Sequence, residues 1–211
     1  MRAALLCLIV LTAAANWWSR LPGERRLTGP VELVSKPLTT VLVIVLALTA
    51  DAPHVQVVTA AVALSLCLLG DVALMGPPSL FVVGLGAFAF AHVAFVVLFV
   101  RYGLDHRTLA GIAVIVGALV AATVGKIVLL HARTREPQLT GPVALYLVVI
   151  LTMAAFGWAT GRGFVLTGTA LFVLSDSLIG WGAFVREGRW QPLAVMVTYH
   201  AAIVSLALSL T

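Results

Sequence analysis

Charged residues are scarce in this chain: only 10% of its 211 residues are Asp, Glu, Lys or Arg, whereas 62% are hydrophobic. A water-soluble domain carries about 25% charged residues. So few charges cannot cover a surface exposed to water, and no polar stretch is long enough to form a separate soluble domain. We therefore expect an all-α integral membrane protein in which lipid is the solvent for most of the surface.

The chain also has little cysteine and no cluster of basic residues. The two cysteines, Cys7 and Cys67, fall in apolar segments without a disulfide or metal-binding spacing, so we predict that both are small buried residues. The net charge of +5 favours contact with anionic lipid headgroups. Because the basic residues are scattered among loops, they do not form the charged face that a nucleic-acid partner would require.

Long apolar runs are what the sequence has instead. A bilayer core of about 30 Å requires about 20 apolar residues in a helix. We predict a single transmembrane domain over residues 1–211, in which Gly, Pro and charge clusters separate the spans. The first run lacks a signal-peptide cleavage site and ends in Trp17–Trp18, which is typical of an interfacial belt. The eight predicted spans are 2–18, 31–50, 54–75, 79–101, 108–130, 140–160, 163–185 and 190–210.

Pro37 falls inside the second predicted span. A proline there predicts either a kinked helix or a shorter helix that begins at Pro37. Both possibilities keep the remaining spans unchanged.

The distribution of basic residues predicts the orientation. Eight spans place both termini on one side, where the loops hold four basic residues. The loops on the other side hold seven, and Lys36 and Lys126 lie close to that side. By the positive-inside rule, the loops that hold seven basic residues are cytoplasmic, and both termini are outside. The seven residues are Arg20, Arg25, Arg26, Arg133, Arg135, Arg186 and Arg189.

The two halves of the chain share short similarities. TGPVELVS at 28–35 recurs as TGPVALYL at 140–147, and LLGDVAL around Asp71 resembles VLSDSLI around Asp176. His92 in the fourth span parallels His200 in the eighth. Two four-helix halves would be related as a parallel repeat. Chance similarity between apolar segments is the alternative.

Polar residues deep in the spans are candidates for function, because an ionised carboxylate at the bilayer centre costs about 2.5–3.5 kcal/mol. Two aspartates in similar contexts favour a functional role. A single His or Tyr is more often a satisfied polar group that holds helices together. The candidates are Asp71, Asp176, His92 and His200, which lie deep, and Glu32, Lys36 and Tyr146, which lie nearer one boundary.

The order of the spans brings these candidates to one half of the membrane, facing the basic loops. Lys36 opens the second span from that side, Asp71 lies near the end of the third, and Tyr146 lies in the first turns of the sixth. Glu32 and Lys36 are four residues apart, so they can pair on one helix face. Lys36 could also be only a snorkelling anchor at the membrane boundary.

At these residues the sequence resembles the YhhN-type lysoplasmalogenase family of membrane proteins. Two departures from the family pattern are Phe95, where a Tyr is frequent three residues after the His, and the stretch TYHAAIV, which has no Gln after its Tyr. The matching segments are KPLTT at 36–40, LSLCLLGDVALM at 64–75, FVVGLGAFAFAHVAF at 81–95, Tyr146 with Met153, and GTALFVLSDSLIG at 168–180.

The resemblance implies hydrolysis of the vinyl ether bond of a lysoplasmalogen, a lysophospholipid in the bilayer, to a fatty aldehyde and glycerophospho-ethanolamine or -choline. Vinyl ethers hydrolyse through a cation formed by protonation of carbon, and two carboxylates serve similar chemistry in glycosidases. Close carboxylates resist double ionisation, so one would keep its proton. We expect Asp71 and Asp176 to form this catalytic pair and no cofactor or metal to take part.

The other candidates are expected to support that pair. His92 and Tyr146 would orient the carboxyl groups, and Lys36 would either bind the phosphate or tune a carboxylate. Ser175, Glu32 and His200 complete the expected set.

Two other function classes remain open. A metal-dependent lipid hydrolase could use His92, His200, Asp71 and Asp176 as zinc ligands, although the sequence has no H-E-x-x-H motif. A proton-coupled transporter could use the same buried Asp and His side chains as a proton relay.

Overall fold

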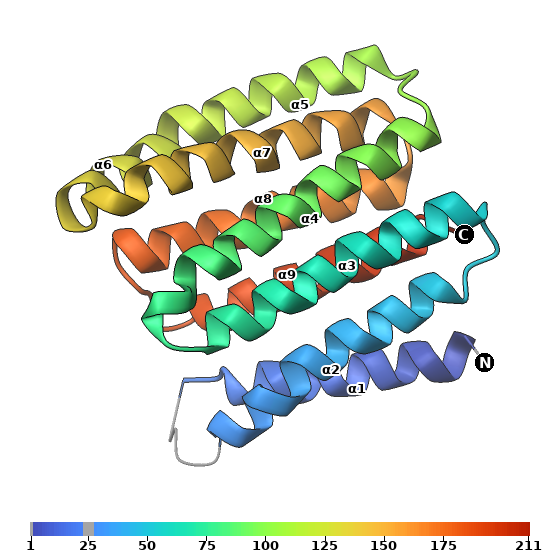
Figure 1. Cartoon of the computed structure of the whole chain (residues 1–211), viewed down its shortest axis with the longest axis horizontal. Coiled ribbons are helices and arrows are strands. Elements are labelled where there is room, and N and C mark those ends of the chain that lie inside the picture. The colour runs from blue at the N-terminus through green and yellow to red at the C-terminus, as the bar shows by residue number, and fades with distance from the viewer. Residues whose placement is uncertain (1, 23–27) are drawn as a thin grey trace.

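The computed structural model describes residues 2–22 and 28–211, and all regular elements of that part are helical. The long helices lie side by side along one axis (Figure 1). Within the described chain, eight helical segments are long and apolar enough to cross a membrane, which confirms the all-α membrane fold. The helices are α1 (Arg2–Ser19), α2 (Thr28–Leu48), α3 (His54–Met75), α4 (Phe81–Tyr102), α5 (Arg107–Val120), α6 (Lys126–Arg135), α7 (Thr140–Ala159), α8 (Gly163–Phe184) and α9 (Gln191–Leu208).

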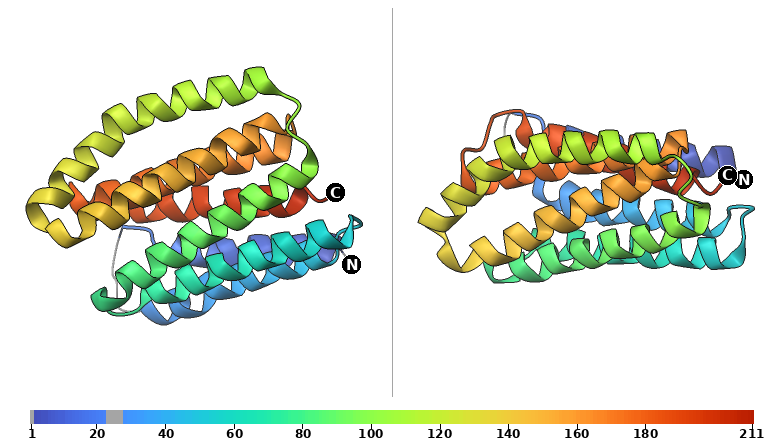
Figure 2. Two further views of the ribbon diagram at one scale, coloured as in Figure 1. Left: turned by 45° about the horizontal axis from the view of Figure 1, so that its top comes forward. Right: turned by 90° about the horizontal axis from the view of Figure 1, so that it is seen from above.

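The fifth predicted span is built from two helices. A π-helical segment, Ala121–Gly125, joins α5 to α6, so that the span runs without interruption from Arg107 to Arg135. A π segment inserts a wider turn into an α-helix. In Figure 2, α5 and α6 form one long bent helix along the outer edge of the bundle.

α2 passes through Pro37 and begins at Thr28, so the alternative of a short helix starting at Pro37 is wrong. Proline removes one backbone hydrogen bond inside a helix. The hydroxyl of Thr39 donates to the carbonyl of Ser35 at 2.7 Å in the same region.

Both chain ends lie at one end of the bundle (Figure 1). The connections α1–α2, α3–α4, α6–α7 and α8–α9 lie at the opposite end, which carries Arg20, Arg133, Arg135, Arg186 and Arg189 and is called the basic end below. Arg25 and Arg26 lie outside the described residues.

Close packing of α3 against α4 and of α8 against α9 builds the centre of the bundle. Phe95, Phe99 and Phe172 are fully buried there. Gly70 permits the close approach of α4, because a Cβ at this position would lie 2.5 Å from the ring of Phe88.

The periphery is apolar, as lipid contact requires. Large side chains such as Leu11, Phe90 and Val148 are more than 60% exposed. Cys67 is buried as predicted, whereas Cys7 is exposed on α1, so the prediction for Cys7 is wrong. An outward-facing position on a helix that contacts lipid suits a small apolar thiol as well as the core does.

Candidate intramembrane active site

Asp71 on α3 is the centre of one buried polar cluster. Its side chain is 1% exposed, and the Lys36 Nζ lies 3.2 Å from its Oδ1. The hydroxyls of Thr40 and Tyr199 donate to Oδ2 at 2.8 and 2.7 Å. Lys36 and Thr40 are four residues apart and so share one face of α2. Two hydroxyl donors, one from α2 and one from α9, therefore bond Oδ2, and the Lys36 ammonium group faces Oδ1.

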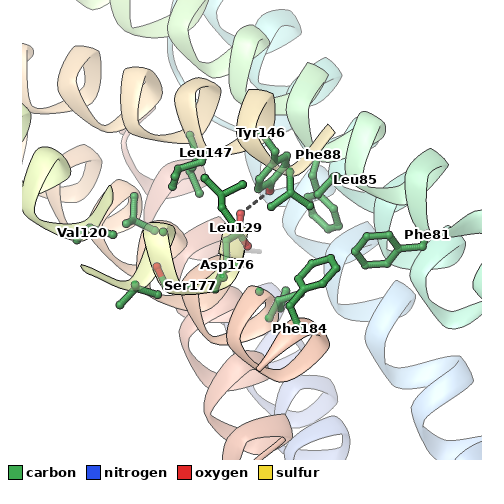
Figure 3. Close-up of a pocket in the computed structure, with 18 of the residues that line it drawn as sticks. Phe81, Leu85, Phe88, Val120, Leu129, Tyr146, Leu147, Asp176, Ser177 and Phe184 are labelled. Carbon is green, nitrogen blue, oxygen red and sulfur yellow. Dashed lines mark hydrogen bonds between the residues drawn. The ribbon is translucent and has the colours of Figure 1, made fainter. Parts of the chain in front are cut away.

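Asp176 on α8 is the centre of the second cluster. The Tyr146 hydroxyl donates to its Oδ2 (Figure 3), and the His92 Nε2 lies 2.9 Å from that hydroxyl and 3.4 Å from Oδ2. In the part of the chain that the structure describes, no donor reaches Oδ1 of Asp176. The side chain is 11% exposed, so one oxygen of this carboxyl group remains available to a ligand.

The two clusters are built by corresponding helices of the two halves. Asp71 is bonded from α2 and α9, and Asp176 is bonded from α7 and α4. Exchanging α2 with α7, α3 with α8 and α4 with α9 maps one arrangement onto the other. This geometry supports the duplication but pairs His92 with Tyr199, not with His200. The chemical difference is that a cation contacts Asp71, whereas a phenol and an imidazole contact Asp176.

Both carboxyl groups line one cavity of about 340 Å³. Lys36 and Tyr199 also line it, and Arg20, Glu187 and Gln191 contribute from the basic end. Over residues 2–22 and 28–211, no hydrogen bond or ion pair joins Asp71 directly to Asp176. The two acids therefore share a space for a ligand or water, and each keeps its own set of partners.

Glu32 and Lys36 do not form the local pair that their spacing predicts. The Arg20 guanidinium lies 2.5 Å from the Glu32 carboxylate, while Lys36 turns inward to Asp71. Lys36 is 6% exposed, so it is not a snorkelling anchor. An unpaired carboxylate at Asp71 would be costly in this environment, which explains why the lysine pairs there.

His200 and Ser175 lie outside these clusters. The Trp17 Nε1 donates to the His200 Nδ1 at 3.1 Å and joins α9 to α1. The Ser175 hydroxyl donates to the carbonyl of Val195 at 3.2 Å and joins α8 to α9. Both residues hold helices together. Among the described residues, no group of three or more His, Cys, Asp or Glu side chains has an arrangement suited to a metal ion.

Three residues of the site were not predicted: Thr40, Tyr199 and Arg20. Thr40 could have been found from its spacing to Lys36, four residues earlier. Tyr199 corresponds to His92 under the repeat, so a gapped comparison of the halves could have indicated it. No pattern in the sequence indicates that Arg20 reaches the cavity, because its position depends on packing of α1 against α2.

A model of the YhhN family matches residues 31–210, a range that includes both carboxyl groups and the side chains bonded to them. The chain belongs to the YhhN family. No solved structure matches it.

Several curated relatives are named lysoplasmalogenases. The chain is 34% identical over 141 residues to lysoplasmalogenase TMEM86B of Homo sapiens, covering 67% of this chain and 58% of that protein. It is 32% identical over 147 residues to the Rattus norvegicus protein of that name (70% and 59%). It is 29% identical over 124 residues to the lysoplasmalogenase of Mycobacterium tuberculosis (58% and 48%). The matched part thus spans less than two thirds of these relatives.

One departure from the YhhN pattern has a structural reason. Phe95 is fully buried and packs against Phe99 and Phe172. It contributes to the aromatic core of this chain. The hydroxyl that His92 contacts belongs to Tyr146 on α7.

Proposed function

We propose that this protein is a lysoplasmalogenase, which hydrolyses the vinyl ether bond of a lysoplasmalogen to a fatty aldehyde and a glycerophospholipid headgroup. The observation that carries the proposal is that two carboxyl groups with different partners, one buried and one slightly exposed, line one cavity. Membership of the YhhN family and the names of the curated relatives support the choice of substrate.

Asp176 is the proton donor in this proposal. Its Oδ1 has no described partner, whereas its Oδ2 accepts the Tyr146 hydroxyl. The carboxylic acid transfers its proton to the alkenyl carbon remote from oxygen, which leaves an oxocarbenium cation at the adjacent carbon. Water adds to that carbon and gives its proton back to Asp176. The hemiacetal then collapses to the aldehyde and the free alcohol of the headgroup.

Asp71 supplies the fixed negative charge. It accepts bonds from Thr40 and Tyr199 and pairs with the Lys36 ammonium group. A carboxylate held in a site of low dielectric stabilises a nearby cation more strongly than it would in water. The buried ion pair therefore favours the role of Lys36 as a residue that tunes a carboxylate.

Arg20 is the better candidate for the phosphate. It lines the part of the cavity near the basic end, where Glu32 holds its guanidinium. Arginine binds phosphate oxygens in a fixed fork geometry. If the basic end is cytoplasmic, as the positive-inside rule predicts, then the headgroup enters from that side.

His92 and Tyr146 position the acid. The His92 imidazole contacts the Tyr146 phenol, and the phenol donates to Asp176. These two contacts fix the orientation of the carboxyl group. It leaves Oδ1 as the oxygen that carries the transferable proton.

The experiment replaces each aspartate singly with asparagine and measures aldehyde release from a lysoplasmalogen in detergent or liposomes. Asp176→Asn should lower turnover by about 10²–10⁴-fold, the usual contribution of a general acid. Asp71→Asn should also lower turnover strongly. The matched control is Asp51→Asn, an exposed aspartate in the α2–α3 connection, which should leave the rate unchanged.

Near-normal turnover by a folded Asp71→Asn or Asp176→Asn variant would refute the pair. Absence of aldehyde release by the wild-type protein, together with solute uptake into proteoliposomes, would favour the alternative function of a proton-coupled transporter.

A further inference from the structure

Charges of both signs line the polar cavity at the basic end of the bundle. Arg20 contributes a guanidinium group there, and Glu187, in the connection between α8 and α9, contributes a carboxylate. The guanidinium group pairs with Glu32, and deeper in the cavity Lys36 pairs with Asp71. Among the residues that the structure describes, no basic side chain forms an ion pair with Glu187. Its carboxylate is therefore available to a cationic group of a ligand.

The α8–α9 connection brings its acidic residue to the cavity and keeps its basic residues away from it. Glu187 lines the cavity. Arg186 and Arg189, which flank Glu187 in the sequence, are exposed and lie outside the cavity lining. The connection therefore presents a negative charge to the cavity and its positive charges to the surroundings.

Side-chain contacts hold this connection in place on both sides of Glu187. The Gln191 Oε1 accepts the backbone N–H of Gly188, the next residue in the chain, at 2.8 Å. The Arg135 Nη1 donates to the carbonyl of Val185 at 3.2 Å. A carboxylate on a backbone fixed in this way loses less conformational freedom when it binds a ligand. The position of Glu187 is therefore suited to recognition.

We propose that Glu187 binds the ammonium group of a zwitterionic lipid headgroup and so determines which headgroups the site accepts. This inference rests on the proposed function, in which Arg20 binds the phosphate of the same headgroup. An aminoalkyl phosphate carries an anion and a cation close together, and Arg20 and Glu187 offer the complementary charges in one cavity. Such complementarity contributes to specificity more than to affinity. A headgroup that ends at the phosphate would leave Glu187 without a cation and bring a second negative charge toward it.

The test compares two substrates that differ only in the aminoalkyl group. One is a lysoplasmalogen with an ethanolamine headgroup, and the other is the same alkenyl lipid with a terminal phosphate. The variant is Glu187→Gln, which keeps the size of the side chain and removes its charge. The matched control is Glu136→Gln, an exposed glutamate in the α6–α7 connection at the same end of the bundle, outside the cavity lining. The values of kcat and KM are measured separately for each substrate.

Glu187→Gln should raise KM for the ethanolamine substrate by about fivefold, the upper end of what one exposed ion pair contributes. The kcat for this substrate should stay unchanged, and KM for the terminal phosphate should not rise. The effect should shrink as the ionic strength rises, because salt screens exposed charges. The Glu136→Gln control should behave as the wild type with both substrates. Equal rises in KM for both substrates, or no change in either, would overturn the inference.

A binding measurement separates this inference from the proposed function. The probes are two non-hydrolysable alkyl-ether lysophospholipids, one with an ethanolamine headgroup and one with a terminal phosphate. Glu187→Gln should shift the ratio of their Kd values by about fivefold toward the terminal phosphate. That shift would support the inference even if no aldehyde were released. An unchanged ratio, or failure of the wild-type protein to bind the ethanolamine probe, would contradict it whatever the hydrolysis assay shows.

Discussion

The buried ion pair between Lys36 and Asp71 gives a quantitative prediction. The two charged groups are 3.2 Å apart and 8% and 1% exposed. At this distance, with an effective dielectric constant of about 20, their attraction is about 5 kcal/mol. Removing one partner of a buried pair leaves the other charge uncompensated and typically costs about 3–5 kcal/mol. Lys36→Met and Asp71→Asn should therefore each destabilise the folded protein by this amount.

The double variant distinguishes structure from catalysis. Lys36→Met/Asp71→Asn carries neither charge, so its free energy of unfolding should return to within about 1 kcal/mol of the wild type, because neutral replacement of a buried pair is often tolerated. Its aldehyde release should remain as low as that of Asp71→Asn. Stability is measured by thermal unfolding in detergent and activity by aldehyde release. The energetic coupling of Lys36 and Asp71 would be refuted if the stability losses of the single variants simply added in the double variant. It would also be refuted if each single variant lost less than about 1 kcal/mol of unfolding free energy.

Three further predictions follow from single contacts. Tyr199→Phe removes one donor to the Asp71 carboxylate, a bond worth about 1.5–3 kcal/mol, and should lower kcat by roughly 10- to 100-fold without unfolding the protein. Gly70→Ala should lower the Tm, because the added methyl group would clash with the ring of Phe88. The control Gly86→Ala should leave the Tm unchanged, because a Cβ at that position has no neighbour within 4 Å. In a Glu187→Cys variant, the cysteine at this exposed position should react with a membrane-impermeant maleimide only after cells are permeabilised. Labelling of this cysteine in intact cells would reverse the predicted orientation.

The positions of the spans could be predicted because lipid imposes length and apolarity on every helix. The fate of individual polar side chains could not be predicted in the same way. Glu32 and Lys36 have the spacing of a local pair, yet each finds a partner on another helix. His200 has the depth of a catalytic group, yet it bonds to Trp17. Which partner a buried polar group finds depends on helix rotation and packing, and apolar sequence determines these only weakly.

The two carboxyl groups lie in similar positions but have different partners, and the proposed chemistry depends on that difference. Under the predicted duplication, Asp71 on α3 and Asp176 on α8 occupy equivalent positions, and each is bonded from two other helices. Two acids in identical surroundings would divide the roles of proton donor and counter-charge only through their mutual repulsion, and either acid could then take either role. Lys36 beside Asp71, and Tyr146 with His92 beside Asp176, make the surroundings unequal. In the proposed mechanism, the asymmetry of these partners assigns the fixed charge to Asp71 and the proton transfer to Asp176.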